Sequence, residues 1–83
     1  MSMSVRVLFF AQVSDATGIR EESYVLPDGA SVAELLRLIT SKYEKIEKTR
    51  VMMKIAVNRL MAEQSHVLRD GDVVALFPPI SGG

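Results

Sequence analysis

The chain has 83 residues, which predicts one small domain, and 48% of them are hydrophobic, which favours a folded globule over disorder. Ten basic residues balance ten acidic ones, so the chain has no electrostatic attraction to nucleic acid or to an anionic membrane. Because there is no cysteine and only one histidine, His66, the composition excludes disulfides, thiol catalysis and multi-histidine metal sites within one chain.

The sequence carries no recognisable targeting segment. No positive charge precedes an apolar run near its start, and the run over residues 7–11 is shorter than the core of a signal peptide. No stretch approaches the roughly 20 apolar residues that a transmembrane helix needs. We therefore expect a cytoplasmic protein that has no membrane partner.

Two strands are expected in the first third of the chain. Apolar side chains on both faces predict a strand over Val5–Ala11. The polar cluster that follows predicts a turn, containing about one helical turn that Ser14 caps and Gly18 closes. A second strand is expected over Ser23–Leu26, starting nearer Ile19, and its connection to the first favours antiparallel pairing.

The main helix is expected over Ser31–Tyr43, after a turn at residues 27–29. Ser31 and Glu34 have the S-x-x-E spacing of a capping box, which satisfies free N–H groups at the start of a helix. Apolar side chains then recur at the i, i+3, i+4, i+7 positions of one helix face and predict a buried stripe: Val32, Leu35, Leu36, Ile39 and Tyr43. The charged stretch over residues 44–48 is expected to be solvated surface.

A third strand is expected over Met53–Asn58, with Met53, Ile55 and Val57 pointing inward, followed by a turn at Asn58-Arg59 and a very short strand within residues 60–66. Asp70-Gly71-Asp72 is typical of a turn. Its carboxylates could be read as metal ligands, but no third ligand accompanies them, so the turn is favoured. We expect His66 to be a surface loop residue and not a catalytic base.

The last strand is expected over Val73–Phe77, because an almost wholly apolar run is typical of a central strand in parallel pairing. One helix covers only one face of a sheet, so apolar surface should remain on the other face. We expect that second face to carry Leu8, Phe10, Val74 and Leu76, pointing away from Val7, Phe9 and Ala75. Exposed apolar patches commonly mark partner sites.

The end of the sequence has the most unusual chemistry. Pro78 and Pro79 cannot donate to a sheet ladder, so we expect the strand to end there and a flexible arm to follow over residues 78–83. Gly82 and Gly83 lack side chains and can enter a channel too narrow for other residues. The α-carboxylate of Gly83 is ionised at pH 7 and needs no base to attack an electrophile such as the α-phosphate of ATP. The alternative is a frayed terminus that happens to end in glycine.

Over about residues 5–83 the sequence resembles the small, sulfur-carrying subunit of molybdopterin synthase. The matching segments are residues 7–11, 17–18, 31–36, 56–58 and 68–75 and, most specific of all, Phe77-Pro78-Pro79-Ile80-Ser81-Gly82-Gly83. The sequence departs from the family at Ser14, where arginine is frequent, and at Val73, where glutamate is usual.

The resemblance implies an α+β fold of the ubiquitin-like β-grasp type, a mixed sheet with one main crossover helix over about residues 31–43, in a single domain over residues 1–83. The last strand would be central and parallel to the first. An E1-like activating enzyme would use ATP with Mg to adenylate Gly83, and a sulfur donor would convert the acyl-adenylate to a thiocarboxylate. That sulfur would pass to cyclic pyranopterin monophosphate and form the dithiolene of molybdopterin.

The resemblance also implies a heterotetramer, in which two small subunits flank a dimer of large ones and each tail enters a large subunit. The chain would then be a sulfur donor without catalytic side chains or a bound cofactor of its own. From these implications and the apolar second face, we expect the partner to be contacted by Leu8, Phe10, Phe77, Pro78, Pro79, Ile80 and Ser81.

Two alternatives share the Gly-Gly ending. One is a sulfur carrier for another pathway such as thiamine thiazole synthesis, although the ending F-P-P-I-S-G-G favours the molybdopterin branch. The other is a ubiquitin-like modifier that is joined through Gly83 to lysines of target proteins. Adenylation chemistry is common to all three.

Overall fold

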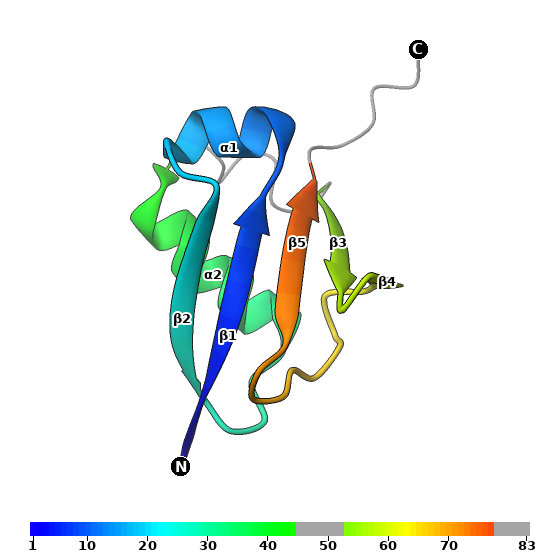
Figure 1. Ribbon diagram of the computed structural model, residues 1–83. Helices are drawn as coiled ribbons and strands as arrows, with labels where there is room; N and C mark the ends of the chain where they lie inside the picture. The colour runs from blue at the N-terminus through cyan, green and yellow to red at the C-terminus, as the bar shows by residue number, and fades with distance from the viewer. Residues whose placement is uncertain (45–52, 78–83) are drawn as a thin grey trace.

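The computed structural model describes residues 1–44 and 53–77 and contains one mixed sheet with two helices (Figure 1). The described strands lie in the order β2-β1-β5-β3-β4. In chain order the elements are β1 (Ser2–Phe9), α1 (Ala11–Thr17), β2 (Glu21–Pro27), α2 (Val32–Lys42), β3 (Lys54–Val57), β4 (Leu60–Ala62) and β5 (Val73–Phe77).

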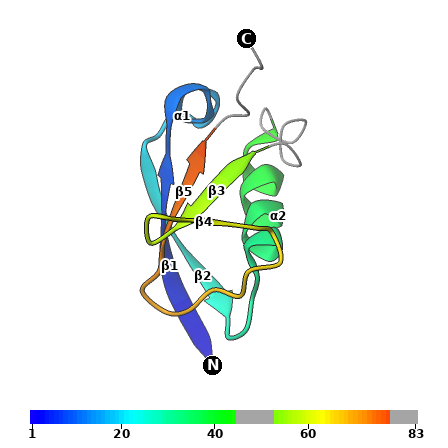
Figure 2. The same ribbon diagram turned by 90° about the vertical axis from the view of Figure 1, so that its right-hand side faces the viewer.

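The last strand is central, as the apolar run at 73–77 predicts. β5 pairs parallel with β1 and antiparallel with β3, and β2 pairs antiparallel with the outer side of β1. α2 lies behind the sheet in Figure 1, and the turned view of Figure 2 shows that it covers one face only. The opposite face is therefore left without a helix over most of its length.

The start and the buried stripe of α2 confirm the expected helix. Ser31 is its N-cap, and the Ser31 hydroxyl accepts a hydrogen bond from the Glu34 N–H at 3.3 Å. The stripe packs against the sheet, since Val32, Leu35, Leu36 and Ile39 are all 0% exposed. The helix ends one residue earlier than expected, with Tyr43 as its C-cap.

The core lies between α2 and the helix-covered face of the sheet. Alternate residues of β1 are buried, as period-2 geometry requires: Met3, Val5, Val7 and Phe9. The register pairs Val7 with Val74 and pairs Phe9 with Leu76, so these residues share the core face, and Val74 and Leu76 are 0% exposed. The expectation that Val74 and Leu76 lie on the second face is therefore wrong, and Ala75 lies there instead. An unbroken apolar run has no alternation from which the face could be read.

The segment after β1 also corrects the sequence-based expectation. β1 ends at Phe9, one residue before the N-cap of α1, which is Phe10. Ser14 does not cap α1, because it lies inside the helix, where its hydroxyl donates to the Ile19 carbonyl at 3.1 Å. Gly18 closes α1 as expected, in the left-handed region at φ 78°, which favours glycine. Val13 of this helix is buried and extends the core past the end of β1.

The turn at residues 70–72 is confirmed, and its two carboxylates accept hydrogen bonds from other segments of the chain. The Asp72 carboxylate accepts hydrogen bonds from the Arg69 N–H at 2.8 Å and from the Asn58 side-chain amide at 2.9 Å. The Asp70 carboxylate accepts one from the Ser4 N–H at 2.7 Å. The short strand after the Asn58-Arg59 turn is confirmed as β4, and His66 is an exposed loop residue. In residues 1–44 and 53–77, no helix is long and apolar enough to cross a membrane.

Candidate functional site

Two aromatic rings from opposite ends of the chain meet on the helix-free face of the sheet. The Phe10 and Phe77 rings are stacked, with centroids 4.8 Å apart and planes at 14°. The Phe10 N–H donates to the Leu76 carbonyl at 3.2 Å, which fixes the start of α1 beside the end of β5. Phe10 is 41% exposed, so the pair presents aromatic surface to solvent. Phe77 is the last described residue, and the Pro78-Pro79 segment follows directly from it.

These rings form one wall of an open groove of about 660 Å³, which we call the aromatic groove. The pairing of Ala56 with Ala75 and with Met61 places these residues on the same face as the rings. The groove is lined by Leu8, Phe10, Ala56, Asn58, Arg59, Met61, Val73, Ala75 and Phe77. The structure thus brings together the predicted contact residues Leu8, Phe10 and Phe77. Sequence reasoning missed the β3–β4 wall, for which the only signal is strand register.

Asn58 holds the β3–β4 hairpin against β5. Its N–H donates to the Val73 carbonyl at 2.8 Å, and its side-chain oxygen accepts from the Val73 N–H at 3.0 Å. Its side-chain NH₂ donates to the buried Asp72 carboxylate. Both polar atoms of this side chain are therefore engaged within the protein, and the far wall of the groove has a defined position.

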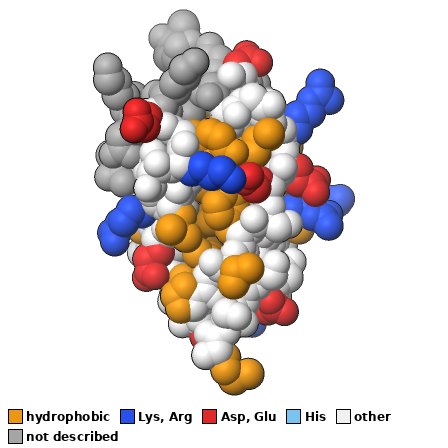
Figure 3. Space-filling model, turned by 90° about the vertical axis from the view of Figure 1, so that its left-hand side faces the viewer, with side chains coloured by type: hydrophobic (Ala, Val, Ile, Leu, Met, Phe, Trp, Pro, Cys, Tyr) orange, Lys and Arg blue, Asp and Glu red, His pale blue; other side chains and the backbone are white. Residues whose placement is uncertain are grey.

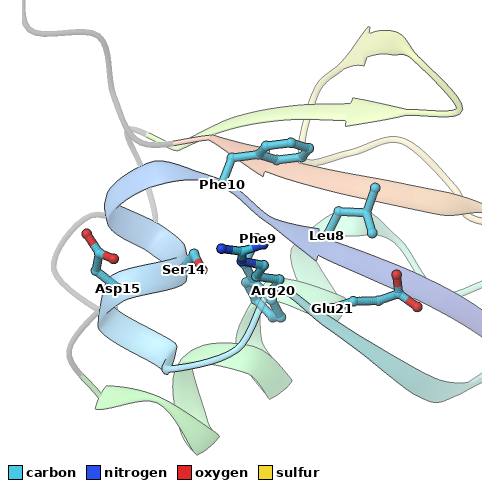
Figure 4. A pocket seen from close by; sticks show the side chains of 7 residues that line it. All are labelled: Leu8, Phe9, Phe10, Ser14, Asp15, Arg20 and Glu21. Carbon is cyan, nitrogen blue, oxygen red and sulfur yellow. The ribbon is translucent and has the colours of Figure 1, made fainter.

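A second hollow, of about 550 Å³, adjoins the aromatic groove where α1 meets β2. Figure 4 shows Leu8 and Phe10 on the same side of β1, with Ser14 on the face of α1 toward the loop that carries Arg20. Ser14, one of the two departures from the family pattern, thus lines this hollow. Its charged members include Glu21, which makes an exposed ion pair with Arg6 at 3.3 Å.

A different cluster lies at the β2 edge, where Figure 3 shows hydrophobic side chains gathered around a basic and an acidic one. The Glu22 carboxylate accepts from Lys42 at 2.7 Å and from the Tyr24 and Tyr43 hydroxyls. The Lys42 hydrogen bond, together with that from Tyr24, holds the pKa of Glu22 below its usual range. Burial and the hydrogen bond to Glu22 raise the pKa of Tyr24 above its usual range. These contacts tie β2 to the end of α2, away from the aromatic groove.

The remaining predicted site residues, Gly82 and Gly83 at the reacting end and Pro78, Pro79, Ile80 and Ser81 before them, lie outside the described residues. Chemistry at the tip therefore stays a prediction. What the structure adds is the surface at the base of this segment.

A five-stranded mixed sheet crossed by one main helix, with a parallel central pair, defines a ubiquitin-like β-grasp protein of the α+β class. The fold matches a solved ubiquitin of Caldiarchaeum subterraneum with a TM-score of 0.70 and 12% identity, over 100% of both chains, a likeness of fold alone. The ThiS family model matches residues 7–83, and the chain belongs to this family.

Similar proteins are known in both sequence and structure. The molybdopterin synthase sulfur carrier subunit of Chlamydomonas reinhardtii is 32% identical over 83 residues, covering 98% of this chain and 100% of that protein. A solved protein of Pyrococcus furiosus, described as a putative molybdopterin converting factor subunit 1, has a TM-score of 0.84 and 34% identity, covering 94% of this chain and 99% of that one.

Two further solved structures bear on partners and alternatives. A complex of subunits 1 and 2 of the molybdopterin-converting factor from Helicobacter pylori contains a chain with a TM-score of 0.63 and 30% identity, covering 98% of this chain and 100% of that one. The Haloferax volcanii protein SAMP1 has a TM-score of 0.83 and 26% identity, covering 96% of this chain and 99% of that one.

Proposed function

We propose that this chain is the sulfur-carrier subunit of a molybdopterin synthase and that Gly83 carries the sulfur. The observation that carries the proposal is the match, over nearly the whole chain, to proteins named molybdopterin synthase sulfur carrier subunit. The Phe77–Gly83 ending supports it, because an unhindered terminal carboxylate suits activation and transfer. The absence of cysteine agrees with it, since the sulfur must be held on something other than a thiol.

Gly83 would be loaded in two displacement steps. A carboxylate oxygen of Gly83 would attack the α-phosphorus of ATP, and pyrophosphate would leave. Hydrosulfide from the sulfur donor would then attack the carbonyl carbon of the acyl-adenylate, AMP would leave with one of the former carboxylate oxygens, a proton would be released, and the terminal group would become a thiocarboxylate. An activating enzyme of the E1 type supplies the ATP site and magnesium. This chain supplies the nucleophile, whose side-chain-free carbon leaves the approach open.

The aromatic groove would dock the large subunit while the tail reaches its active site. Exposed aromatic side chains with partly buried flanks are frequent binding hot spots. Phe77 belongs both to the groove and to the base of the tail, so docking there would fix where the tail begins. The large subunit accepts the sulfur for cyclic pyranopterin monophosphate. The complex of subunits 1 and 2 in the Helicobacter protein supports a partner of this kind.

Deletion of Gly83 tests the proposal, because position matters as much as chemistry at the tip. The variant keeps a glycine carboxylate, now on Gly82, but an extended tail is shorter by about 3.5 Å. Displacing a reacting atom by about 1 Å can cost about a hundredfold in rate. We therefore expect folding and most partner affinity to remain and sulfur loading and transfer to be lost. The readout is intact mass after incubation with activating enzyme, ATP and a sulfur source, where sulfur replaces one oxygen in the wild type.

Two matched variants separate the effect of tail length from the effect of side-chain bulk at the tip. One added residue after Gly83 should also abolish transfer, while Gly82→Ala keeps the length and adds only a side-chain carbon. A deletion variant that still gains sulfur and still supports dithiolene formation would refute the terminal-glycine mechanism.

A protein modifier is the second candidate. SAMP1, the small archaeal modifier protein 1 of Haloferax volcanii, has the same fold at 26% identity. Isopeptide conjugates through Gly83 on other cellular proteins would identify a modifier, whereas a free thiocarboxylate would identify a carrier. Loss of molybdopterin on deletion of the gene separates this pathway from thiazole synthesis.

A further inference from the structure

The aromatic groove carries one unusual charge. Its lining is apolar except for Asn58 and Arg59, and both polar atoms of the Asn58 side chain are engaged within the protein. Within residues 1–44 and 53–77, no carboxylate lies at ion-pair distance from the Arg59 guanidinium. Arg59 is thus a permanently charged, planar hydrogen-bond donor beside an apolar floor, and no described acidic group neutralises it.

The same face carries a second cation. Lys54 is paired with Phe77 across β3 and β5, so the two side chains emerge on the same face, and Lys54 is exposed. Arg6 on β1 is paired with Glu21 at 3.3 Å, and Arg20 lines the adjoining hollow together with Asp15 and Glu21. Among the residues that line the aromatic groove, the uncompensated charge is therefore the positive charge of Arg59.

The backbone at Arg59 is in a conformation that arginine avoids. Asn58 and Arg59 occupy the two central positions of the hairpin turn, with φ values of 51° and 73°. Such turns favour asparagine first and glycine second, because glycine alone has no side-chain carbon to crowd the left-handed region. Asn58 fits this preference and Arg59 does not. Unfavourable backbone conformations in ordered turns are often retained where a side chain is needed for function.

We propose that Arg59 determines which partner the groove accepts by pairing with a carboxylate on the segment of the large subunit that covers Phe10 and Phe77. This inference rests on the docking role proposed above and adds the chemistry of the contact. A partner that covers the groove removes water from around the guanidinium, which strengthens its attraction to an opposite charge and makes a missing partner charge costly. A partner segment with an apolar side chain would pack on the apolar lining of the groove, and an acidic residue beside that side chain would pair with Arg59.

The test is titration calorimetry of the full-length chain with the large subunit from the same organism, at about 50 mM and about 500 mM NaCl. The Debye length is about 3 Å at 1 M salt and about 10 Å at 0.1 M, so an ion pair at a groove rim weakens between these conditions. The variants are Arg59→Gly, Arg59→Lys and Arg59→Glu. Arg37→Glu is the matched control, because Arg37 is exposed on α2, on the opposite side of the sheet, and the charge change is the same. Phe77→Ala is the positive control for the groove.

Arg59→Gly should weaken binding about three- to tenfold in low salt, and Arg59→Glu should weaken it by more than about tenfold, with both losses smaller in high salt. The affinity of Arg59→Lys for the large subunit should lie between those of the wild type and Arg59→Gly. The affinity of Arg37→Glu should stay within about twofold of the wild-type value. Arg59→Gly should also raise the melting temperature, because it relieves the left-handed backbone. Higher stability with lower affinity is a pattern that a merely structural residue does not produce.

Two results would overturn this inference, and the first of them leaves the proposed docking role in place. One is equal affinity for Arg59→Glu and Arg37→Glu when Phe77→Ala binds weakly. The other is a salt-sensitive homodimer, found by light scattering and abolished by Arg59→Glu, which would make a second copy the occupant. A wild type that does not bind the large subunit at all would overturn the proposed function, and this inference with it.

Discussion

Glu22 illustrates how a single residue joins two elements. Its carboxylate on β2 receives hydrogen bonds from Lys42 at the end of α2 and from Tyr24 and Tyr43. Phe9 packs edge-to-face on Tyr43, with ring centroids 6.3 Å apart, so the cluster continues into the core. The Glu22 side chain is 23% exposed, which leaves it partly shielded from solvent.

Glu22→Gln should make the protein less sensitive to acid. The folded protein holds the pKa of Glu22 below the ordinary value of 4.5, so the ionised carboxylate stabilises the fold above that pH. This stabilisation is lost as the pH falls below about 4.5 through the lower folded pKa. At neutral pH we expect the variant to be less stable by about 0.5–1 kcal/mol. The measurement is urea unfolding, followed by circular dichroism, at neutral pH and at about pH 3.

Glu21→Gln is the matched control for this prediction. Glu21 is the neighbouring acidic residue, and its ion pair with Arg6 is exposed to solvent. If both variants change the acid sensitivity equally, the Glu22 cluster has no special role in the pH dependence.

At the scale of the element, α2 depends on its buried stripe and not on its length. Leu35→Ala removes a 0% exposed side chain from the middle of this stripe and should lower the free energy of unfolding by about 2–5 kcal/mol. This is a large fraction of a small domain's stability. Chemical denaturation gives the value directly.

Leu38→Ala, in the same helix but 46% exposed, makes the same chemical change without leaving a cavity. We expect it to cost less than about 1 kcal/mol. Similar losses at the two positions would show that the packing of α2 on the sheet is not what stabilises it.

At the scale of the whole molecule, the folded core and the proposed sulfur chemistry belong to different parts of the chain. The described core runs from Met3 to Leu76, and β5 completes it by lying between β1 and β3. A chain that ends at Phe77 should therefore melt within about 4 °C of the full chain, corresponding to less than about 1 kcal/mol, while losing all sulfur loading. Differential scanning calorimetry and intact mass measure the two properties.

A chain that ends at Asp72 is the control, because it lacks the central strand and should not fold. A large fall in melting temperature for the chain ending at Phe77 would show that residues 78–83 contribute to the stability of the body.

Local sequence was sufficient to predict α2, the turns at Gly18 and at residues 70–72, and the presence of the strands. In each case the signal comes from neighbours within a few residues: a cap at Ser31, a period of 3.6 in the helix, or a glycine at positive φ. The Gly82-Gly83 hypothesis likewise came from the sequence, because it depends on backbone chemistry and a free carboxylate, and the structure does not describe these residues.

Only the tertiary structure decided which faces the apolar strands present. Val73–Phe77 is apolar throughout, so its sequence does not distinguish a core residue such as Leu76 from a groove residue such as Ala75. Parallel pairing with β1, between segments more than 60 residues apart, makes that choice. The same pairing brings Phe10 to Phe77, and the β3–β4 hairpin adds Arg59 to the groove they form. Side-chain chemistry can be read along the chain, but its assembly into a surface depends on strand register, which is a property of two strands together.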